Sequence, residues 1–317
     1  MAEKYHVSSN PHIRDSWSTR KIMACVIIAL LPAFGFGVYN FGPRAALVVL
    51  TCIVSCVLSE LLFDRIRKKK MTVWDLTAVV TGLLLGLNLP VSMPLWMAAL
   101  GSIFAIVVVK CLFGGLGQNF LNPALGGRAF LVISFPVAMT NWQTDAYTGA
   151  TPLAVVKAGG SPDILSMFVG TTAGTIGETS VFCLLIGAAF LLLLGIIDLR
   201  IPGSYLLSFL LFAVLFGGHG ADPAFLAAQL AGGGLMLGAF FMATDYVTRP
   251  ATNAGQIVFG IFLGIMTGIF RFFGPNAEGV SFAILLGNLL VPLIEKVTKP
   301  VPFGFTRKDL RKGGKAS

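Results

Sequence analysis

Residues 22–63 read IMACVIIALLPAFGFGVYNFGPRAALVVLTCIVSCVLSELLF and contain only two charged side chains, Arg44 and Glu60. The stretch divides into two apolar runs, 22–41 and 45–63. Each run is close to the length of about 20 residues that an α-helix needs to cross the hydrocarbon core of a bilayer. This stretch therefore predicts two consecutive transmembrane helices.

The composition of the whole chain is also strongly apolar. Of its 317 residues, 56% are hydrophobic and 12% are charged, against a charged fraction of about 25% in an average soluble protein. So few charges cannot cover a water-facing surface, whereas a chain in lipid needs charges only at its two aqueous rims. The composition excludes a soluble protein and predicts a polytopic membrane protein.

Ten apolar runs are read as membrane spans, although several are shorter than about 20 residues. The runs are 22–41, 45–63, 76–89, 95–113, 123–135, 181–197, 205–216, 225–243, 257–273 and 282–297. We predict an all-α protein with about ten transmembrane helices, some of them short or broken. The predicted parts are an N-terminal segment, 1–21; a first membrane half of five spans, 22–136; an outer loop, 137–180; a second half of five spans, 181–297; and a basic tail, 298–317.

The basic residues fall mostly between the spans. The chain has 23 Lys and Arg residues and a net charge of +9. If the N-terminus lies inside, 19 of the 23 fall on inside segments. The four others, on outer segments or within a short span, are Arg44, Arg128, Lys157 and Arg271. This distribution obeys the positive-inside rule and places both termini in the cytoplasm. We therefore predict a multi-pass membrane protein without a nucleic-acid partner.

The fifth run is too short for a full crossing. It follows the sequence Gly114-Gly115-Leu116-Gly117-Gln118-Asn119-Phe120-Leu121-Asn122-Pro123-Ala124. Asn122 before Pro123 is a helix-start pattern, because Asn caps free amides and Pro fits the first helical turn. A half-helix that begins inside the membrane is tolerated only where it lines an enclosed or wet cavity, and such helices mark binding sites in transporters. The alternative is an ordinary loop that enters a helix.

A second polar stretch also runs into a proline that opens an apolar run. It reads Ala243-Thr244-Asp245-Tyr246-Val247-Thr248-Arg249-Pro250-Ala251. Thr248 or Asp245 is expected to cap the helix that follows, and the same ordinary-loop alternative applies. Prolines at similar places in the two halves hint only weakly at an internal repeat.

Ionisable residues inside a membrane are functional by default, but the centres of these runs hold almost none. The acidic residues near predicted span ends are Glu60, Asp75, Glu178, Asp198 and Asp245. We interpret each as a rim charge or a helix cap rather than an ion ligand, and we assign no ion path. Cys52 and Cys56 share a helix face, but no nearby His or second cysteine pair completes a metal site. We interpret both as small packing residues.

The one long loop, 136–180, is rich in Thr, Gly and Ala. Long loops are usually functional or disordered. This loop contains Asp145-Ala146-Tyr147-Thr148-Gly149-Ala150-Thr151. The last four residues predict a small-residue turn with accessible hydroxyls, and Asp145 could bind a cation that coordinates phosphate. By composition alone, the segment would be interpreted as a flexible tip.

The pattern Asp-x-x-Thr-Gly-Ala-Thr resembles the sequence that a Mg-dependent FMN transferase modifies. That enzyme takes FAD and esterifies FMN to the last Thr or Ser of the pattern. The resemblance implies a covalent FMN, in phosphoester linkage, on Thr151. The other residues of the flavinylation motif would be Asp145, Thr148, Gly149 and Ala150.

Four further segments resemble the family that contains the RnfD component of the Rnf complex and the B component of the sodium-pumping NADH:quinone reductase. They are Ser9-Asn10-Pro11-His12-Ile13-Arg14, Leu30-Leu31-Pro32-Ala33, the run from Gly117 to Ala124, and Ile176-Gly177-Glu178-Thr179-Ser180. The resemblance extends over essentially the whole chain. The lead of 21 residues before the first span favours the Rnf member, because the reductase component has a longer N-terminal extension.

The resemblance implies a membrane electron-transfer subunit of an Rnf-type complex in a bacterial or archaeal cytoplasmic (inner) membrane. Such a complex couples ferredoxin:NAD+ oxidoreduction to Na+ or H+ translocation. It implies as partners the other Rnf subunits (A, B, C, E and G), the FMN transferase and membrane lipid. It also implies a noncovalent riboflavin at Asn119 and Asn122, whose paired amides offer donors and acceptors to an isoalloxazine edge. The chain has no GxGxxG pattern for NAD, so catalysis is expected only from the assembled complex.

Two other classes of function stay open. The broken helices could equally line the substrate cavity of a channel or secondary transporter for a small polar solute. The chain could also be a structural scaffold for redox partners, with the Thr-Gly-Ala-Thr segment an ordinary turn. Solute uptake into proteoliposomes without a redox partner would favour the transporter. Full electron transfer in a Thr151→Val variant would favour the scaffold.

Overall fold

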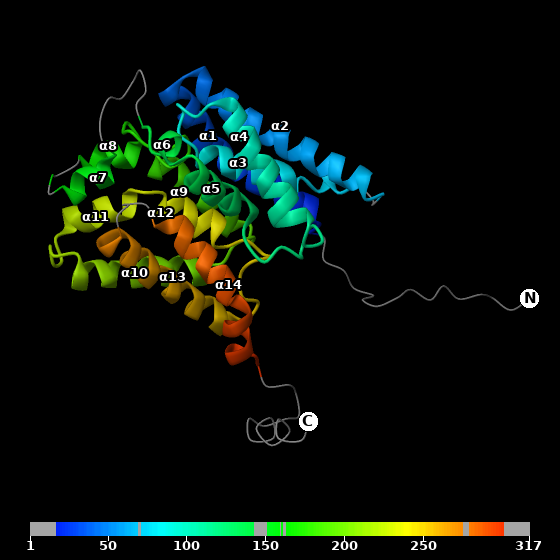
Figure 1. The fold of residues 1–317 in the computed structure, drawn as a ribbon. Coiled ribbons are helices and arrows are strands. Elements are labelled where there is room, and N and C mark those ends of the chain that lie inside the picture. The colour runs from blue at the N-terminus through cyan, green and yellow to red at the C-terminus, as the bar shows by residue number, and fades with distance from the viewer. Residues whose placement is uncertain are drawn as a thin grey trace, which may run out of the picture.

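The structure is a computed structural model that describes residues 17–68, 71–142, 151–158, 160, 163–274 and 279–300. Every regular element in these ranges is a helix (Figure 1). The first half contains α1 (Thr19–Phe41), α2 (Pro43–Ile66), η1 (Val73–Asp75), α3 (Thr77–Leu87), α4 (Leu95–Phe104), η2 (Ala105–Cys111) and α5 (Pro123–Ser134). The second half contains α9 (Val181–Leu193), α10 (Arg200–Phe216), α11 (Pro223–Ala231), α12 (Leu235–Leu237), η3 (Gly238–Met242), α13 (Asn253–Phe273) and α14 (Val280–Thr298).

All ten predicted spans correspond to helices, and the prediction of short and broken spans is confirmed. In the described residues, α1, α2, α13 and α14 are long and apolar enough to cross a membrane. A bent pair, α11 with α12 and η3, would form a fifth span, with a bend of 63° at the break. The other five predicted spans are apolar helices of 10–17 residues. The chain is therefore a polytopic all-α membrane protein.

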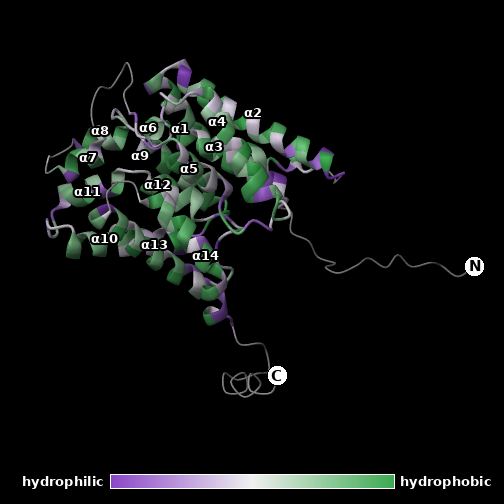
Figure 2. Ribbon diagram, viewed as in Figure 1, coloured by the Kyte–Doolittle hydropathy of each residue, from purple (hydrophilic) through white to green (hydrophobic). Residues whose placement is uncertain are grey.

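The outer faces of the helices are apolar. Figure 2 shows hydrophobic residues along the helices and hydrophilic residues gathered at their ends. Leu193, Ile133 and Leu207 are large apolar side chains that are 70–89% exposed. Apolar side chains at this density are unfavourable in water and are suited to contact with lipid.

One hydrophobic core joins the two halves of the chain. It contains Leu30 of α1, Leu85 of α3 and Leu125 of α5, together with Phe209 of α10 and Phe259 of α13. All five side chains are fully buried. The two predicted membrane halves therefore pack into a single helical body.

α10 and α13 pack against each other at very short range. Gly264 of α13 faces α10, and a Cβ atom there would lie 2.7 Å from the backbone nitrogen of Phe209 and the backbone oxygen of Tyr205. The Tyr205 hydroxyl and the Thr267 hydroxyl, both buried, are 2.6 Å apart and share a hydrogen bond. Small residues and buried polar contacts of this kind hold helices together in lipid.

The predicted loop 136–180 contains three short helices, α6 (Pro136–Met139), α7 (Pro152–Lys157) and α8 (Ile164–Val169). α7 and α8 both contact α11. They lie at the opposite end of the bundle from the start of α1 and the end of α14 (Figure 1). This loop is therefore a small helical layer where it is described, and not only a flexible tip.

Two helices end inside the protein, where their terminal carbonyls need partners. For α3, the backbone amides of Gly177 and Ile176 donate to the carbonyls of Leu87 and Leu89, at 2.8 and 3.1 Å. For α11, Arg271 supplies the donors and reaches the carbonyl of Gly232 at 2.7 Å. Arg271 is therefore buried and caps the C-terminal end of α11. The sequence analysis had placed it on an outer segment or within a short span.

The prediction of the cap of α13 is wrong. Neither Thr248 nor Asp245 caps the helix, because α13 begins three residues after Pro250, at Asn253. The hydroxyl of Thr252 accepts the hydrogen bond from the amide of Gly255, at 3.0 Å. Thr248 instead donates its hydroxyl to the Asp245 carboxylate at 3.1 Å.

Candidate functional site

The start of α5 lies inside the protein, as the Asn122-Pro123 pattern predicts. The Asn122 side-chain oxygen accepts from the amides of Ala124 and Leu125, at 3.0 and 3.3 Å. Its amide nitrogen donates to the Met242 carbonyl, at the end of η3, at 3.3 Å. Asn122 is buried. It therefore joins two interrupted helices from opposite halves of the chain.

Asn119 lies in the turn that leads into α5. Gly114, Gly115 and Gly117 all have φ between +85° and +129°, a backbone region that glycine adopts readily. These glycines let the chain fold back so that Asn119 becomes buried. The Asn119 amide nitrogen donates to the Leu121 carbonyl at 3.0 Å.

Asn119 and Asn122 border the same cavity, as the predicted riboflavin site requires. The cavity encloses about 800 Å3 of free space, including the part open to the surroundings. Its wall is mostly apolar, with contributions from α1, α3, α9 and η3. The polar lining residues are Thr77, Thr81, Lys110, Asn119, Asn122, Thr244 and Asp245, and the aromatic ones are Phe240, Phe241 and Tyr246. An apolar cavity with a few polar groups is typical of a small-molecule site.

The wall of the cavity also includes residues that the sequence analysis did not assign to a binding site. Lys110 lies in η2, and Phe240 and Phe241 lie in η3. Both segments are π-helical, a local form that occurs frequently at functional sites. Asp245 is half-buried and lies just after η3, near the predicted span end at 243. Burial raises the pKa of the Asp245 carboxyl above its ordinary value, and the hydrogen bond from Thr248 opposes that rise.

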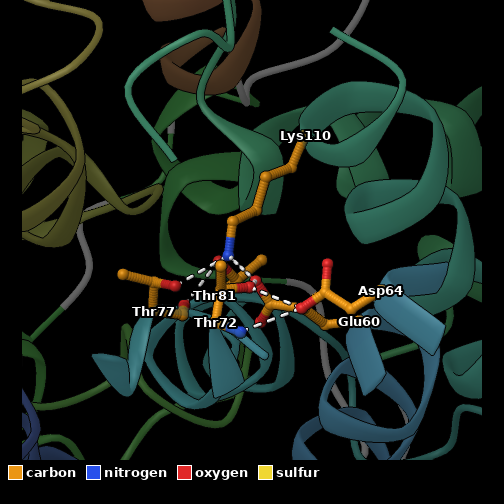
Figure 3. Close-up of polar contacts among 6 residues, drawn as sticks. All are labelled: Glu60, Asp64, Thr72, Thr77, Thr81 and Lys110. Atoms are coloured by element: carbon orange, nitrogen blue, oxygen red, sulfur yellow. Dashed lines mark hydrogen bonds and ion pairs between the residues drawn. The ribbon is translucent and has the colours of Figure 1, made fainter. Parts of the chain in front are cut away.

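Behind Lys110 lies a buried cluster of charged and hydroxyl groups (Figure 3). The Lys110 ammonium donates to Glu60 Oε1 and to the Thr77 hydroxyl, both at 2.7 Å. The Thr72 hydroxyl lies 2.8 Å from Glu60 Oε1 and 2.9 Å from Asp64 Oδ2. Glu60 is 1% exposed and Lys110 is 2% exposed.

The interpretation of Glu60 as a rim charge is therefore wrong. α2 extends to Ile66, beyond the predicted span end at 63, so Glu60 lies well inside the helix and faces Lys110. The expectation of almost no charge within the spans is also wrong. Arg128 is buried in α5, where it donates to the Ser281 hydroxyl. Asp198 agrees with the prediction, since it is half exposed and pairs with Arg200 at 2.7 Å.

Thr151 is the residue before α7. Its hydroxyl oxygen accepts from the Ala154 amide at 3.4 Å, and Pro152 opens the helix. Thr151 borders a cleft of about 390 Å3, including its open part, together with Glu178, Thr179 and Gly233. The other predicted motif residues, Asp145, Thr148, Gly149 and Ala150, lie outside the described residues.

Comparison with known proteins places this architecture in a family. Residues 6–304 match the NQR2, RnfD, RnfE family. The chain belongs to this family.

Three relatives of this NQR2/RnfD/RnfE-family chain match it over nearly their full lengths, and each is named as the D component of its complex. The relative from the Na+-translocating ferredoxin:NAD+ oxidoreductase complex of Acetobacterium woodii is 49% identical, over 98% of each chain. The relative from the proton-translocating ferredoxin:NAD+ oxidoreductase complex of Clostridium ljungdahlii is 43% identical, over 96% of this chain and 97% of the relative. The relative from the ion-translocating oxidoreductase complex of Cronobacter sakazakii is 36% identical, over 95% and 99%.

In this family member, α9 connects the two candidate sites. Thr179, which borders the Thr151 cleft, lies just before α9, and Leu191 near its end borders the Asn119 cavity. α9 has 13 residues, which correspond to about 20 Å of helix. The cleft and the cavity therefore lie toward opposite ends of the bundle.

The cysteines do not form a metal site in the described residues. The thiols of Cys52 and Cys56 lie 4.0 and 3.8 Å from the carbonyl oxygens of Ala98 and Ser102. No group of three or more His, Cys, Asp or Glu side chains in the described ranges is placed to hold a metal. Cys52 and Cys56 pack α2 against α4, in agreement with the prediction.

Proposed function

We propose that this family member is a membrane electron-transfer subunit of an Rnf-type complex, in which electron flow between ferredoxin and NAD+ drives Na+ or H+ across the cytoplasmic membrane. The full-length similarity to relatives named as the D component of such complexes supports this proposal. The observation that carries it is the pairing of two sites by α9, with the Thr151 cleft at one end and the Asn119 cavity at the other. A subunit that moves electrons across a membrane needs a cofactor position toward each surface.

Thr151 is the proposed attachment residue for FMN. The Thr151 hydroxyl oxygen would bond to the FMN phosphorus of FAD, the bond from that phosphorus to AMP would break, and the hydroxyl proton would be released. In the described residues, Thr151 Oγ1 takes part in one hydrogen bond, the acceptance at 3.4 Å from Ala154. The hydroxyl is therefore open to modification, and the cleft beside it is open to the surroundings.

The Asn119 cavity fits a noncovalent flavin by the chemistry of its lining. Asn119 Oδ1 has no hydrogen-bond partner among the described residues, so it can accept from a ring N–H. Phe240 and Phe241 offer aromatic faces beside it. The Asn122 side chain is already engaged with α5 and Met242, so its proposed role is to position the wall. A riboflavin held there would supply one- and two-electron chemistry.

The test of FMN attachment is the intact mass of the chain, with in-gel flavin fluorescence after denaturation, from cells that contain the FMN transferase. We expect a mass increase of FMN less one water on the peptide that carries Thr151. Thr151→Ala should lose the mass and the fluorescence while the protein still inserts, because Thr151 lies outside the core of the bundle. Thr140→Ala is the control, since Thr140 is an exposed threonine of the same loop and should keep both signals.

Flavin at normal stoichiometry in Thr151→Ala, or an unmodified wild-type chain, would contradict the attachment. The second result would direct attention to a transporter for a small polar solute. The specific observation in favour of that function is the cavity at the interrupted helices α5 and η3. Uptake of solute into proteoliposomes without a redox partner would then be the measurement to make.

A further inference from the structure

A buried asparagine of α14 lies behind the wall of the Asn119 cavity. Asn288 is in the middle of this helix and is 4% exposed. α14 packs against both α5 and η3, the two interrupted helices that border the cavity. None of the described residues of α14 borders the cavity itself. Asn288 can therefore affect a molecule in the cavity only through the residues that it contacts.

One contact of Asn288 holds the residue that starts α5. The side-chain oxygen of Asn288 accepts from the backbone amide of Asn122 at 3.1 Å. The backbone amide of a cap residue has no partner within its helix, and the interior of a membrane protein offers no bulk water to replace one. The Asn122 carbonyl accepts from the Gly126 amide at 2.9 Å. Asn288 therefore completes the hydrogen bonds of the Asn122 backbone and fixes its position.

A second contact of Asn288 holds the segment 243–252, which connects η3 to α13. The side-chain nitrogen of Asn288 donates to the Thr248 carbonyl at 3.2 Å. The Thr248 hydroxyl in turn donates to the Asp245 carboxylate at 3.1 Å, and Asp245 borders the cavity. Thr248 is 4% exposed. The position of Asp245 therefore depends on Asn288 through one intermediate residue.

The amide group of Asn288 is suited to these two contacts, which we call the Asn288 link. An asparagine side chain has an acceptor oxygen and a nitrogen with two donor hydrogens. Here the oxygen faces Asn122, and the nitrogen serves the Thr248 carbonyl and the Ile284 carbonyl of its own helix, each at 3.2 Å. Polar contacts between membrane helices commonly hold the helices together. The Asn288 link differs because both of its distant partners are backbone groups at chain breaks that border the cavity.

We propose that Asn288 is a positioning residue of the noncovalent flavin site, which sets the places of Asn122 and Asp245 on the cavity wall and thereby the affinity for riboflavin. The identity of the ligand rests on the proposed function, whereas the Asn288 link rests on the contacts of Asn288 alone. A leucine at this position would have a similar volume but neither donor nor acceptor. It would leave the Asn122 amide and the Thr248 carbonyl without their partner, and both chain breaks could then shift.

Hydrogen exchange of the full-length chain in lipid nanodiscs, without flavin, tests the Asn288 link. In Asn288→Leu, exchange in a peptide that covers residues 119–126 should become roughly tenfold faster, because the Asn122 amide loses its acceptor. The control is Thr267→Val, which removes the buried hydrogen bond to Tyr205 between α10 and α13 and should leave this exchange unchanged. Equal exchange in Asn288→Leu and wild type would overturn the link.

Titration of the same samples with riboflavin, followed by the quenching of its fluorescence, tests the positioning role. The dissociation constant should rise roughly tenfold in Asn288→Leu and stay unchanged in Thr267→Val, even where both variants melt at a lower temperature. In an Asn122→Ala background, Asn288→Leu should add little further loss, because the residue through which it acts is already altered. Fully additive losses would show a general loss of stability and overturn the positioning role.

Two milder variants decide the question if Asn288→Leu does not fold. Asn288→Asp, when ionised, keeps an acceptor for the Asn122 amide but loses the donor to Thr248, and Thr248→Val loses the donor to Asp245. Each should keep slow exchange at residues 119–126 and bind riboflavin more weakly, and wild-type affinity in both would overturn the positioning role. A wild-type chain that binds no riboflavin would instead contradict the cofactor of the proposed function, and exchange at Asn122 would then decide the Asn288 link alone.

Discussion

At the residue scale, the decisive feature is the position of charges inside an apolar bundle. Lys110 lies in the run 95–113 and Glu60 in the run 45–63, fifty residues earlier. Neither would be tolerated alone in the interior. Their pairing at 2.7 Å, with Thr77 as a further partner of Lys110, makes both acceptable there. Arg128 and Arg271 follow the same principle, because each is buried with hydrogen-bond acceptors.

Asn119 and Asn122 are expected to respond differently to substitution by alanine. Asn119→Ala should lose the noncovalent flavin at a smaller cost in stability, because the Asn119 side chain makes one hydrogen bond, to the Leu121 carbonyl in its own turn. Asn122→Ala removes the cap of α5 and leaves the Met242 carbonyl without its donor. That loss should lower the free energy of unfolding by about 1–3 kcal/mol. Flavin content and melting temperature, measured together, check both outcomes. Equal loss of stability in the two variants would contradict the separate roles.

At the scale of the elements, three of the short helices begin or end at partners from distant parts of the chain. α5 begins against η3 through Asn122. α3 ends against the segment 176–177, and α11 ends against Arg271. These contacts replace the water that would satisfy helix ends in a soluble protein. They explain how spans of 10–17 residues persist within a membrane protein.

The contact of α10 with α13 gives a matched pair of glycine substitutions. Gly264→Ala should lower the free energy of unfolding by about 1–3 kcal/mol, because the new Cβ would meet the α10 backbone at 2.7 Å. Gly203→Ala, within α10, has nothing within 4 Å of the new Cβ. It should be neutral or stabilising by about 0.5–1 kcal/mol, because alanine favours a helix over glycine. Thermal unfolding in nanodiscs measures both, and an equal effect would refute close packing as the cause.

At the scale of the whole molecule, the bundle has two unlike ends. The Asn119 cavity and the buried Glu60–Lys110 pair lie toward the end where α1 starts, and the Thr151 cleft lies toward the end formed by α7, α8 and α11 (Figure 1). α9, which is about 20 Å long, connects the Thr151 cleft to the Asn119 cavity. This polarity gives the proposed electron path one cofactor position toward each membrane surface.

The orientation of the bundle is testable with two exposed positions, Ser18 and Ala158. Cysteine substituted at Ser18 should react with a membrane-impermeant maleimide only in inside-out vesicles, because the positive-inside rule places this end in the cytoplasm. Cysteine at Ala158 should react only in right-side-out vesicles. The unchanged chain gives the baseline, since its described cysteines are buried or half-buried. Labelling of both positions from the same side would contradict the predicted topology.

The membrane class, the ten apolar helices and the start of α5 at Asn122-Pro123 could all be predicted from the sequence, because they depend on local hydrophobicity and on capping within a few residues. It also carried the resemblance that points to Thr151. Three features became visible only in the folded chain: Glu60 and Lys110 form a buried pair, Thr252 caps α13, and Asn119 and Phe240 border one cavity. The physical reason is that a charge or a helix end inside a bilayer needs a partner, and in this fold the partner comes from a segment far along the chain.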